Sequence, residues 1–187
     1  ELRYLQHCQA EIRKRQHIEL ANHLLALGDC FYVEDMAWPS LTHRAKEAAI
    51  SEKTGRIKRK KRFGKSVANK APATLIGILE QKCNSLGLPG VMKVPTSLRA
   101  SQYNHQSGEY TSKPLSQRND MPDGERIQRD LYSAFLLQHY DPQAGNFNSA
   151  LLQQDYPQFV QYHYRAIQRL STAPKTLSSM GIQRSLR

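Results

Sequence analysis

Hydrophobic residues recur every three or four positions in several parts of the chain, and this spacing predicts amphipathic helices. On this basis we expect helices over residues 2–27, 72–87, 126–140, 148–154 and 157–170. Gly28 is a plausible stop for the first helix, and Pro72 fits the first turn of the second. The helix that contains Asp130 has the clearest apolar stripe.

Two short apolar runs predict buried strands instead. Cys30 to Glu34 is rich in aromatic and β-branched residues, and Val91 to Val94 is a second strand candidate. A helix lies between them, so the order strand, helix, strand predicts a crossover unit and an α/β architecture. Residues 97–123 are polar and contain few aliphatic side chains, which indicates either a long functional loop or a small inserted lobe.

Charge narrows the class of partner. The chain has 187 residues and a formal net charge of +11. Such an excess favours a polyanion such as nucleic acid, although an acidic partner protein or solubility alone would also explain it. Residues 53–70 contain no acidic side chain, and we interpret them as a loop that becomes ordered on a partner, the alternatives being a localisation signal or a solvated run. No apolar run approaches the ~20 residues of a membrane span, so no membrane partner is expected.

The cysteines bear on the cellular compartment, and the two ends of the chain bear on its completeness and order. Three scattered cysteines argue for a reducing compartment, against a disulfide framework and against a zinc ribbon. The first residue is Glu1 rather than methionine, so we expect a fragment or a processed piece of a longer protein. Residues 171–187 are basic and rich in Ser and Thr, and we expect them to be disordered.

Two carboxylates are the candidates for chemistry. Glu34 ends the first predicted strand, where α/β proteins place ligands, and Asp130 lies near the start of a helix that could present it to the same point. Such carboxylates together suit Mg²⁺, which grips phosphate oxygens. The alternative is that Glu34 is an exposed strand-end acid and Asp130 only favours a helix N-terminus. Asp35 competes with Glu34, but neighbouring strand residues point to opposite faces, so only one can enter a given site.

The residues around these acids resemble a known family. Phe31-Tyr32-Val33-Glu34-Asp35-Met36 resembles the second motif of the RuvC-like nuclease domain in TnpB proteins of insertion sequences and in type V CRISPR effectors. Ile127-Gln128-Arg129-Asp130-Leu131-Tyr132-Ser133-Ala134 resembles the third motif, an Arg-Asp followed by a helix with small residues. The similarity extends to about Tyr140 and includes the Ser101-Gln102 dipeptide.

This resemblance implies an RNase H-like fold, a mixed sheet with flanking helices that is only partly contained in this chain. It implies that Glu34 and Asp130 bind Mg²⁺, or Mn²⁺ in its place, in an RNA-guided DNA endonuclease. Guide RNA and target DNA would be the partners, in a prokaryotic cytoplasm at the nucleoid. The expected nucleic-acid-binding residues are Lys58, Arg59, Lys60, Lys61, Arg62, Lys65 and Arg129.

Two departures from the family pattern keep other functions open. The first motif, a strand that carries a further catalytic Asp, is not found, and we expect it upstream of Glu1. Residues 101–108 replace the zinc ribbon and contain no cysteine, so we predict no zinc. An RNA-guided DNA-binding protein that no longer cuts is the main alternative, and an unrelated accessory subunit is a third. We expect residues 1–140 to form the later part of the nuclease domain, with 97–123 as an inserted lobe, 141–170 as a helical extension and 171–187 as a tail.

Overall fold

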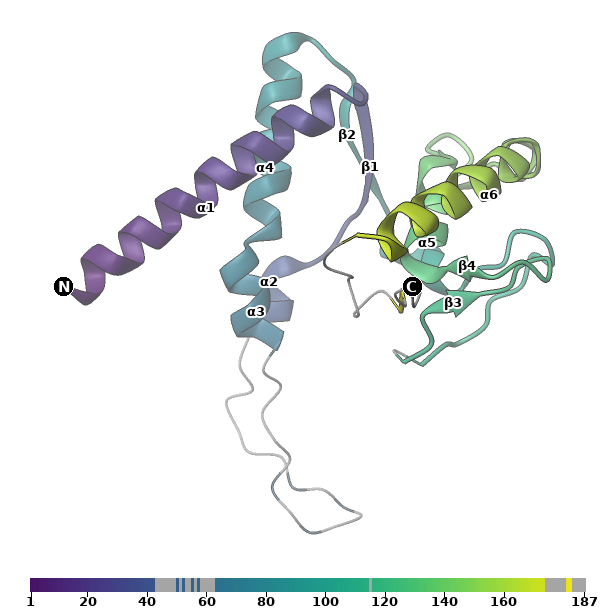
Figure 1. Ribbon diagram of the computed structural model, residues 1–187, viewed down its shortest axis with the longest axis horizontal. Coiled ribbons are helices and arrows are strands. Elements are labelled where there is room, and N and C mark those ends of the chain that lie inside the picture. Colours follow the sequence, from purple (N-terminus) through teal and green to yellow (C-terminus); the bar gives the residue numbers. More distant parts are fainter. Residues whose placement is uncertain are drawn as a thin grey trace. The chain divides into compact units, whose positions relative to one another are not determined.

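The computed structural model describes residues 1–42, 50, 52, 55, 57, 63–114, 116–173, 181 and 182 (Figure 1). Helices combined with small two-stranded sheets confirm the predicted α/β class. The chain divides into two compact units, each described below by itself. Unit 1 comprises residues 1–31 and 36–92, and unit 2 comprises residues 32–35 and 93–187. None of the helices in the described ranges is long and apolar enough to cross a membrane.

Unit 1 is a small helical unit. Its helices are α1 (Leu2–Leu25), α2 (Trp38–Thr42), α3 (Phe63–Lys70) and α4 (Pro72–Leu86). Figure 1 shows α1 crossing α4, and the buried side chains of Ala21, Leu79 and Cys83 lie at this crossing. Gly87 ends α4 with a left-handed φ of 66°, a conformation that costs glycine little. The predicted end of this helix near residue 87 is therefore confirmed.

Both predicted strands are present, one after α1 and the other after α4. β1 (Cys30–Glu34) and β2 (Gly90–Val94) are hydrogen-bonded neighbours. The Gly90 N–H donates to the Asp29 carbonyl at 3.0 Å, and the Asp35 N–H donates to the Val94 carbonyl at 2.8 Å. Both residue numbers rise from the first bond to the second, which is the order of a parallel pair joined by a crossover helix.

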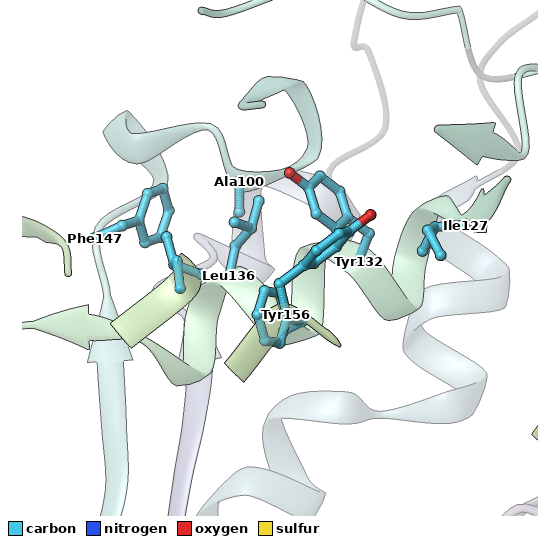
Figure 2. Close-up of a cluster of buried hydrophobic side chains, with 8 residues drawn as sticks. Ala100, Ile127, Tyr132, Leu136, Phe147 and Tyr156 are labelled. Carbon is cyan, nitrogen blue, oxygen red and sulfur yellow. The ribbon is translucent and has the colours of Figure 1, made fainter. Parts of the chain in front are cut away.

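Unit 2 contains the larger hydrophobic core. Its elements are η1 (Thr96–Leu98), η2 (Ala100–Gln102), β3 (Asn119–Asp120), β4 (Ile127–Gln128), α5 (Arg129–Gln138), β5 (Tyr140–Asp141), β6 (Asn146–Phe147) and α6 (Ser149–Ser171). Figure 2 shows the buried cluster at its centre, which α5 and α6 supply together with their neighbours. The cluster consists of Ala100, Ile127, Tyr132, Phe135, Leu136, Phe147, Leu152 and Tyr156.

The helices of unit 2 differ from the sequence prediction in two places. The prediction of separate helices on either side of Pro157 is wrong, because α6 runs through this proline. Leu152 before it and His163 after it are both buried, so packing on one helix face offsets the missing N–H. The third predicted helix begins at Arg129 rather than at residue 126, because Ile127 pairs with Asp120 in the β3–β4 ladder.

The predicted helical extension, residues 141–170, contains most of α6, which supplies Leu152 and Tyr156 to the core of unit 2. The end of the basic segment, expected as a loop, forms α3, and Arg13 Nη1 donates to the carbonyls of Ala68 and Asn69 there. Most of the expected tail lies outside the described residues.

A candidate carboxylate site in unit 2

Glu34 is the last residue of β1, and its side chain is half-buried. Asp35 is exposed, and its N–H continues the pairing with Val94, so the strand geometry holds through both acids. The difference in exposure fits the expectation that neighbouring strand residues point to opposite faces. Within the described part of the chain, the Glu34 carboxylate has no hydrogen-bond or ion-pair partner. A half-buried carboxylate in this state is available to a cation.

Asp130 lies in the first turn of α5 and is exposed. Its negative charge is favourable at this end of the helix dipole. Gln128, which caps the helix, donates from Nε2 to Asp130 Oδ2 at 3.0 Å. This amide is the partner of the Asp130 carboxylate among the described residues, and no cationic side chain there pairs with it.

The structure assigns both carboxylates to the same compact unit, although β1 and α5 are far apart in the sequence. Carboxylates without cationic partners are the kind of ligand that a hard divalent cation such as Mg²⁺ takes. Glu34 and Asp130 would be the residues that hold it. No three His, Cys, Asp or Glu side chains among the described residues converge as a metal site. Glu34 and Asp130 therefore remain the two predicted acidic ligands, both in unit 2.

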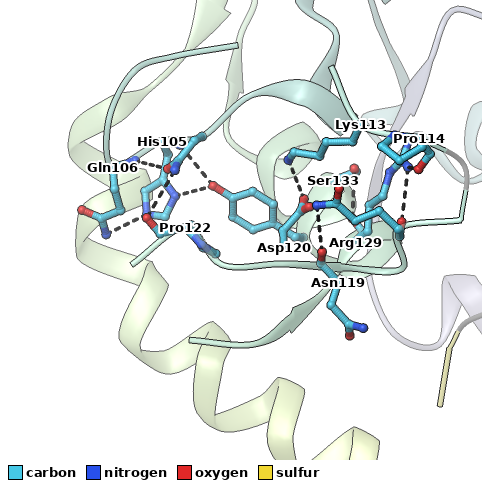
Figure 3. Close-up of polar contacts among 12 residues, drawn as sticks. His105, Gln106, Lys113, Pro114, Asn119, Asp120, Pro122, Arg129 and Ser133 are labelled. Atoms are coloured by element: carbon cyan, nitrogen blue, oxygen red, sulfur yellow. Dashed lines mark hydrogen bonds and ion pairs between the residues drawn. The ribbon is translucent and has the colours of Figure 1, made fainter. Parts of the chain in front are cut away.

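Of the predicted nucleic-acid-binding residues, the structure describes Lys65 and Arg129. Residues 58–62, the centre of the basic segment, lie outside the described residues, and Lys65 lies in α3. Arg129 is half-buried, and its Nη1 donates to the carbonyls of Pro114 at 3.0 Å and Gln117 at 3.4 Å (Figure 3). Arg129 thus fastens the preceding loop to the start of α5, next to Asp130.

A second interaction fixes the same loop. Lys113 Nζ lies 2.9 Å from Asp120 Oδ2, where Asp120 is buried and Lys113 is half-buried (Figure 3). Asp120 belongs to β3, which pairs with β4 immediately before Asp130. A paired, buried charge of this kind is costly to break, so the ion pair holds the loop against the strand that leads into the candidate site.

The predicted inserted lobe is held by aromatic and polar contacts. Tyr103 pairs with Tyr110 in an isolated bridge, and its ring centroid lies 5.2 Å from that of Phe147. His105 is buried; its N–H donates to Tyr132 Oη at 3.1 Å, and its Nδ1 lies 2.7 Å from the same oxygen. Burial raises the pKa of Tyr132 well above its ordinary value of 10.0, so the hydroxyl keeps its proton and can donate to Nδ1.

We expect two buried histidines to make the stability of unit 2 depend on pH. Burial lowers the pKa of His105 and of His163 below 6.5, and for His105 the nearby Asp123 only partly opposes this. Both rings are therefore neutral in the folded chain at pH values where the unfolded chain already binds protons. We expect the free energy of unfolding to be unaffected by these groups above pH 6.5 and to fall as the pH drops below it, by up to about 1.4 kcal/mol per pH unit for each histidine.

Urea unfolding of unit 2 at pH 7.5 and at 5.5 measures this effect. His105→Gln should reduce the loss between the two pH values, because one titrating group is removed. The exposed His7 provides the matched control, and His7→Gln should leave the loss unchanged. A free energy of unfolding of unit 2 that is the same at both pH values would contradict the prediction.

Sequence reasoning missed Gln128, which contacts Asp130, and His163, which contacts Gln128. Gln128 precedes the Arg-Asp pair and is 2% exposed, and its N–H donates to Nε2 of the buried His163 at 3.0 Å. Glutamine is not among the preferred N-cap residues, and the predicted helix began at residue 126, so no local signal identified Gln128 as a cap. His163 carries no local signal either, because its contact spans two elements that only the fold brings together. The chain was compared with protein-family models, with curated proteins and with solved structures, and nothing matches it in any of the three.

Proposed function

We propose that this chain is the later part of an RNase H-like, RuvC-type nuclease domain in an RNA-guided DNA endonuclease. One observation carries the proposal. Glu34 at a strand end and Asp130 in the first turn of a helix belong to one compact unit, and neither has a cationic partner among the described residues. The two motifs that resemble the family contain these same acids.

Mg²⁺ bound at such a site would activate water and stabilise the charge that develops on the scissile phosphate. The residues of this chain bind the cation and hold the surrounding backbone in position. Glu34 and Asp130 hold the cation, and the Arg129 contacts keep the loop that precedes α5 in place. A further carboxylate from the first motif completes the ligand set in the family pattern, and we propose that it lies upstream in the same protein.

The guide RNA and target DNA are proposed on charge. The net charge of +11 and the acid-free segment 53–70 favour a phosphate backbone as partner. Within this segment we assign backbone contacts to Lys58, Arg59, Lys60, Lys61, Arg62 and Lys65. Each phosphate contact should steepen the dependence of log affinity on log salt concentration by roughly 0.9 for duplex and 0.7 for single-stranded nucleic acid.

Asp130→Asn in the complete protein, loaded with its guide RNA, tests the proposal. We expect Mg²⁺-dependent DNA cleavage to fall by at least about 100-fold, because even partners outside the first ligand sphere are typically worth 10–100-fold. Glu109 is an exposed acid of unit 2 and provides the matched control, so Glu109→Gln should cut like the parent. Undiminished cleavage by Asp130→Asn would overturn the proposal. Guided binding without any cleavage by the parent protein would instead support an inactive DNA-binding protein.

A further inference from the structure

Gln128 is held by hydrogen bonds at both its backbone and its side chain. Its backbone N–H donates to His163 Nε2 at 3.0 Å, and its Oε1 accepts from the Leu131 N–H at 2.7 Å. Its Nε2 donates to Asp130 Oδ2 at 3.0 Å. The residue is 2% exposed, so water does not compete for these bonds.

The orientation of the Gln128 amide follows from its partners. The Leu131 N–H can only donate, so the amide atom that faces it must be the oxygen. The nitrogen must then point the other way, toward Asp130, where it donates to one carboxylate oxygen. Because helix capping fixes the amide, the donor that faces Asp130 is fixed as well. The second oxygen, Oδ1, has no partner among the described residues and remains for a ligand.

His163 makes this arrangement rigid. Its ring is 4% exposed and lies on α6, while Gln128 lies in β4. Since Nε2 accepts the Gln128 N–H, a neutral ring carries its proton on Nδ1. Protonation of Nε2 would break the bond, so the neutral state of the buried ring preserves it. Two elements of unit 2 thus converge on the residue that contacts Asp130.

We propose that Gln128 is the positioning residue of Asp130, which it binds through Oδ2 so that Oδ1 is presented to the divalent cation. This inference rests on the proposed function, because it assigns Asp130 to a metal. Metal-binding carboxylates are commonly oriented by hydrogen bonds from a residue that does not itself touch the metal. Gln128 fills that place here, with its other side-chain atom engaged in the helix cap.

The helix cap offers a purely structural explanation, and the chain provides a control for it. Asn148 caps α6, and its Oδ1 accepts from the Leu151 N–H at 3.1 Å, without any contact to Asp130. Gln128→Met and Asn148→Ala each remove one helix cap in unit 2. Both should lower the melting temperature by a similar few degrees. Only Gln128→Met also removes the donor to Asp130.

The test is a titration of Mn²⁺ into the ¹⁵N-labelled chain, followed by the paramagnetic broadening of the Asp130 and Leu131 amide signals. We expect Gln128→Met to weaken Mn²⁺ binding about 10–100-fold and Asn148→Ala to leave it within about twofold. Equal weakening by both variants would show a general effect of cap loss and overturn the proposal. Unchanged binding in Gln128→Met, with binding abolished in Asp130→Asn, would overturn the positioning role and leave the proposed function intact. Absence of broadening in the complete parent protein, which includes the proposed upstream carboxylate, would overturn both.

Discussion

Replacing Glu34 with Gln should reduce Mg²⁺-dependent DNA cleavage by the complete protein at least about 100-fold. The substitution keeps the size of the side chain and its capacity to accept hydrogen bonds, but it removes the negative charge that holds the cation. Glu34 has no hydrogen-bond or ion-pair partner in the described part of the chain, so little folding energy depends on its charge. The melting temperature should therefore stay within about 2 °C of the parent.

Asp35 makes this prediction specific. It is the neighbouring acid, it is exposed, and its backbone N–H rather than its side chain takes part in the strand pairing. Asp35→Asn should therefore leave cleavage within about threefold of the parent. Measurement of single-turnover cleavage rates at saturating Mg²⁺ compares the two variants directly. If Asp35→Asn abolished cleavage and Glu34→Gln did not, Asp35 rather than Glu34 would be the acid that enters the site.

The elements that the sequence predicted best are those in which local chemistry and packing agree. The strand over Cys30–Glu34 has the predicted bounds, and α4 starts at Pro72 and is capped by Gly87. Prediction failed where packing opposes a local signal. Pro157 is a strong helix breaker, yet the buried residues on both sides of it keep α6 continuous. A single sequence contains no direct record of such tertiary compensation.

In the candidate site, too, some residues are marked by local sequence and others are brought in only by the fold. Glu34 and Asp130 could be proposed from the sequence because each stands near the end of a predictable element and within a short motif. The partner residues could not all be found, because His163 reaches Gln128 only when α6 packs against β4. The predicted inserted lobe is similar. Its polar composition was visible in the sequence, but the contact of His105 with Tyr132 that supports the lobe depends on the fold of unit 2.

Leu136→Ala should lower the free energy of unfolding of unit 2 by about 3 kcal/mol. Leu136 is 0% exposed and lies within the core cluster, so truncation removes buried apolar surface and leaves a cavity that the aromatic neighbours cannot fully close. Alanine is at least as good a helix former as leucine, so the loss comes from packing and not from helix propensity. Native-state hydrogen exchange at the amides of α5 measures this unit alone, and a loss of 3 kcal/mol corresponds to exchange roughly 150-fold faster.

Leu151 provides the matched control for this substitution. It is also a helical leucine of unit 2, but it is 45% exposed, so Leu151→Ala should cost less than about 1 kcal/mol. Equal losses in the two variants would contradict a core centred on α5. Asp130 stands on the same helix as Leu136, and its position depends on the packing that holds α5 in place. Mn²⁺ binding at Asp130 should therefore be lost together with α5 when Leu136→Ala is warmed, and at a lower temperature than in Leu151→Ala.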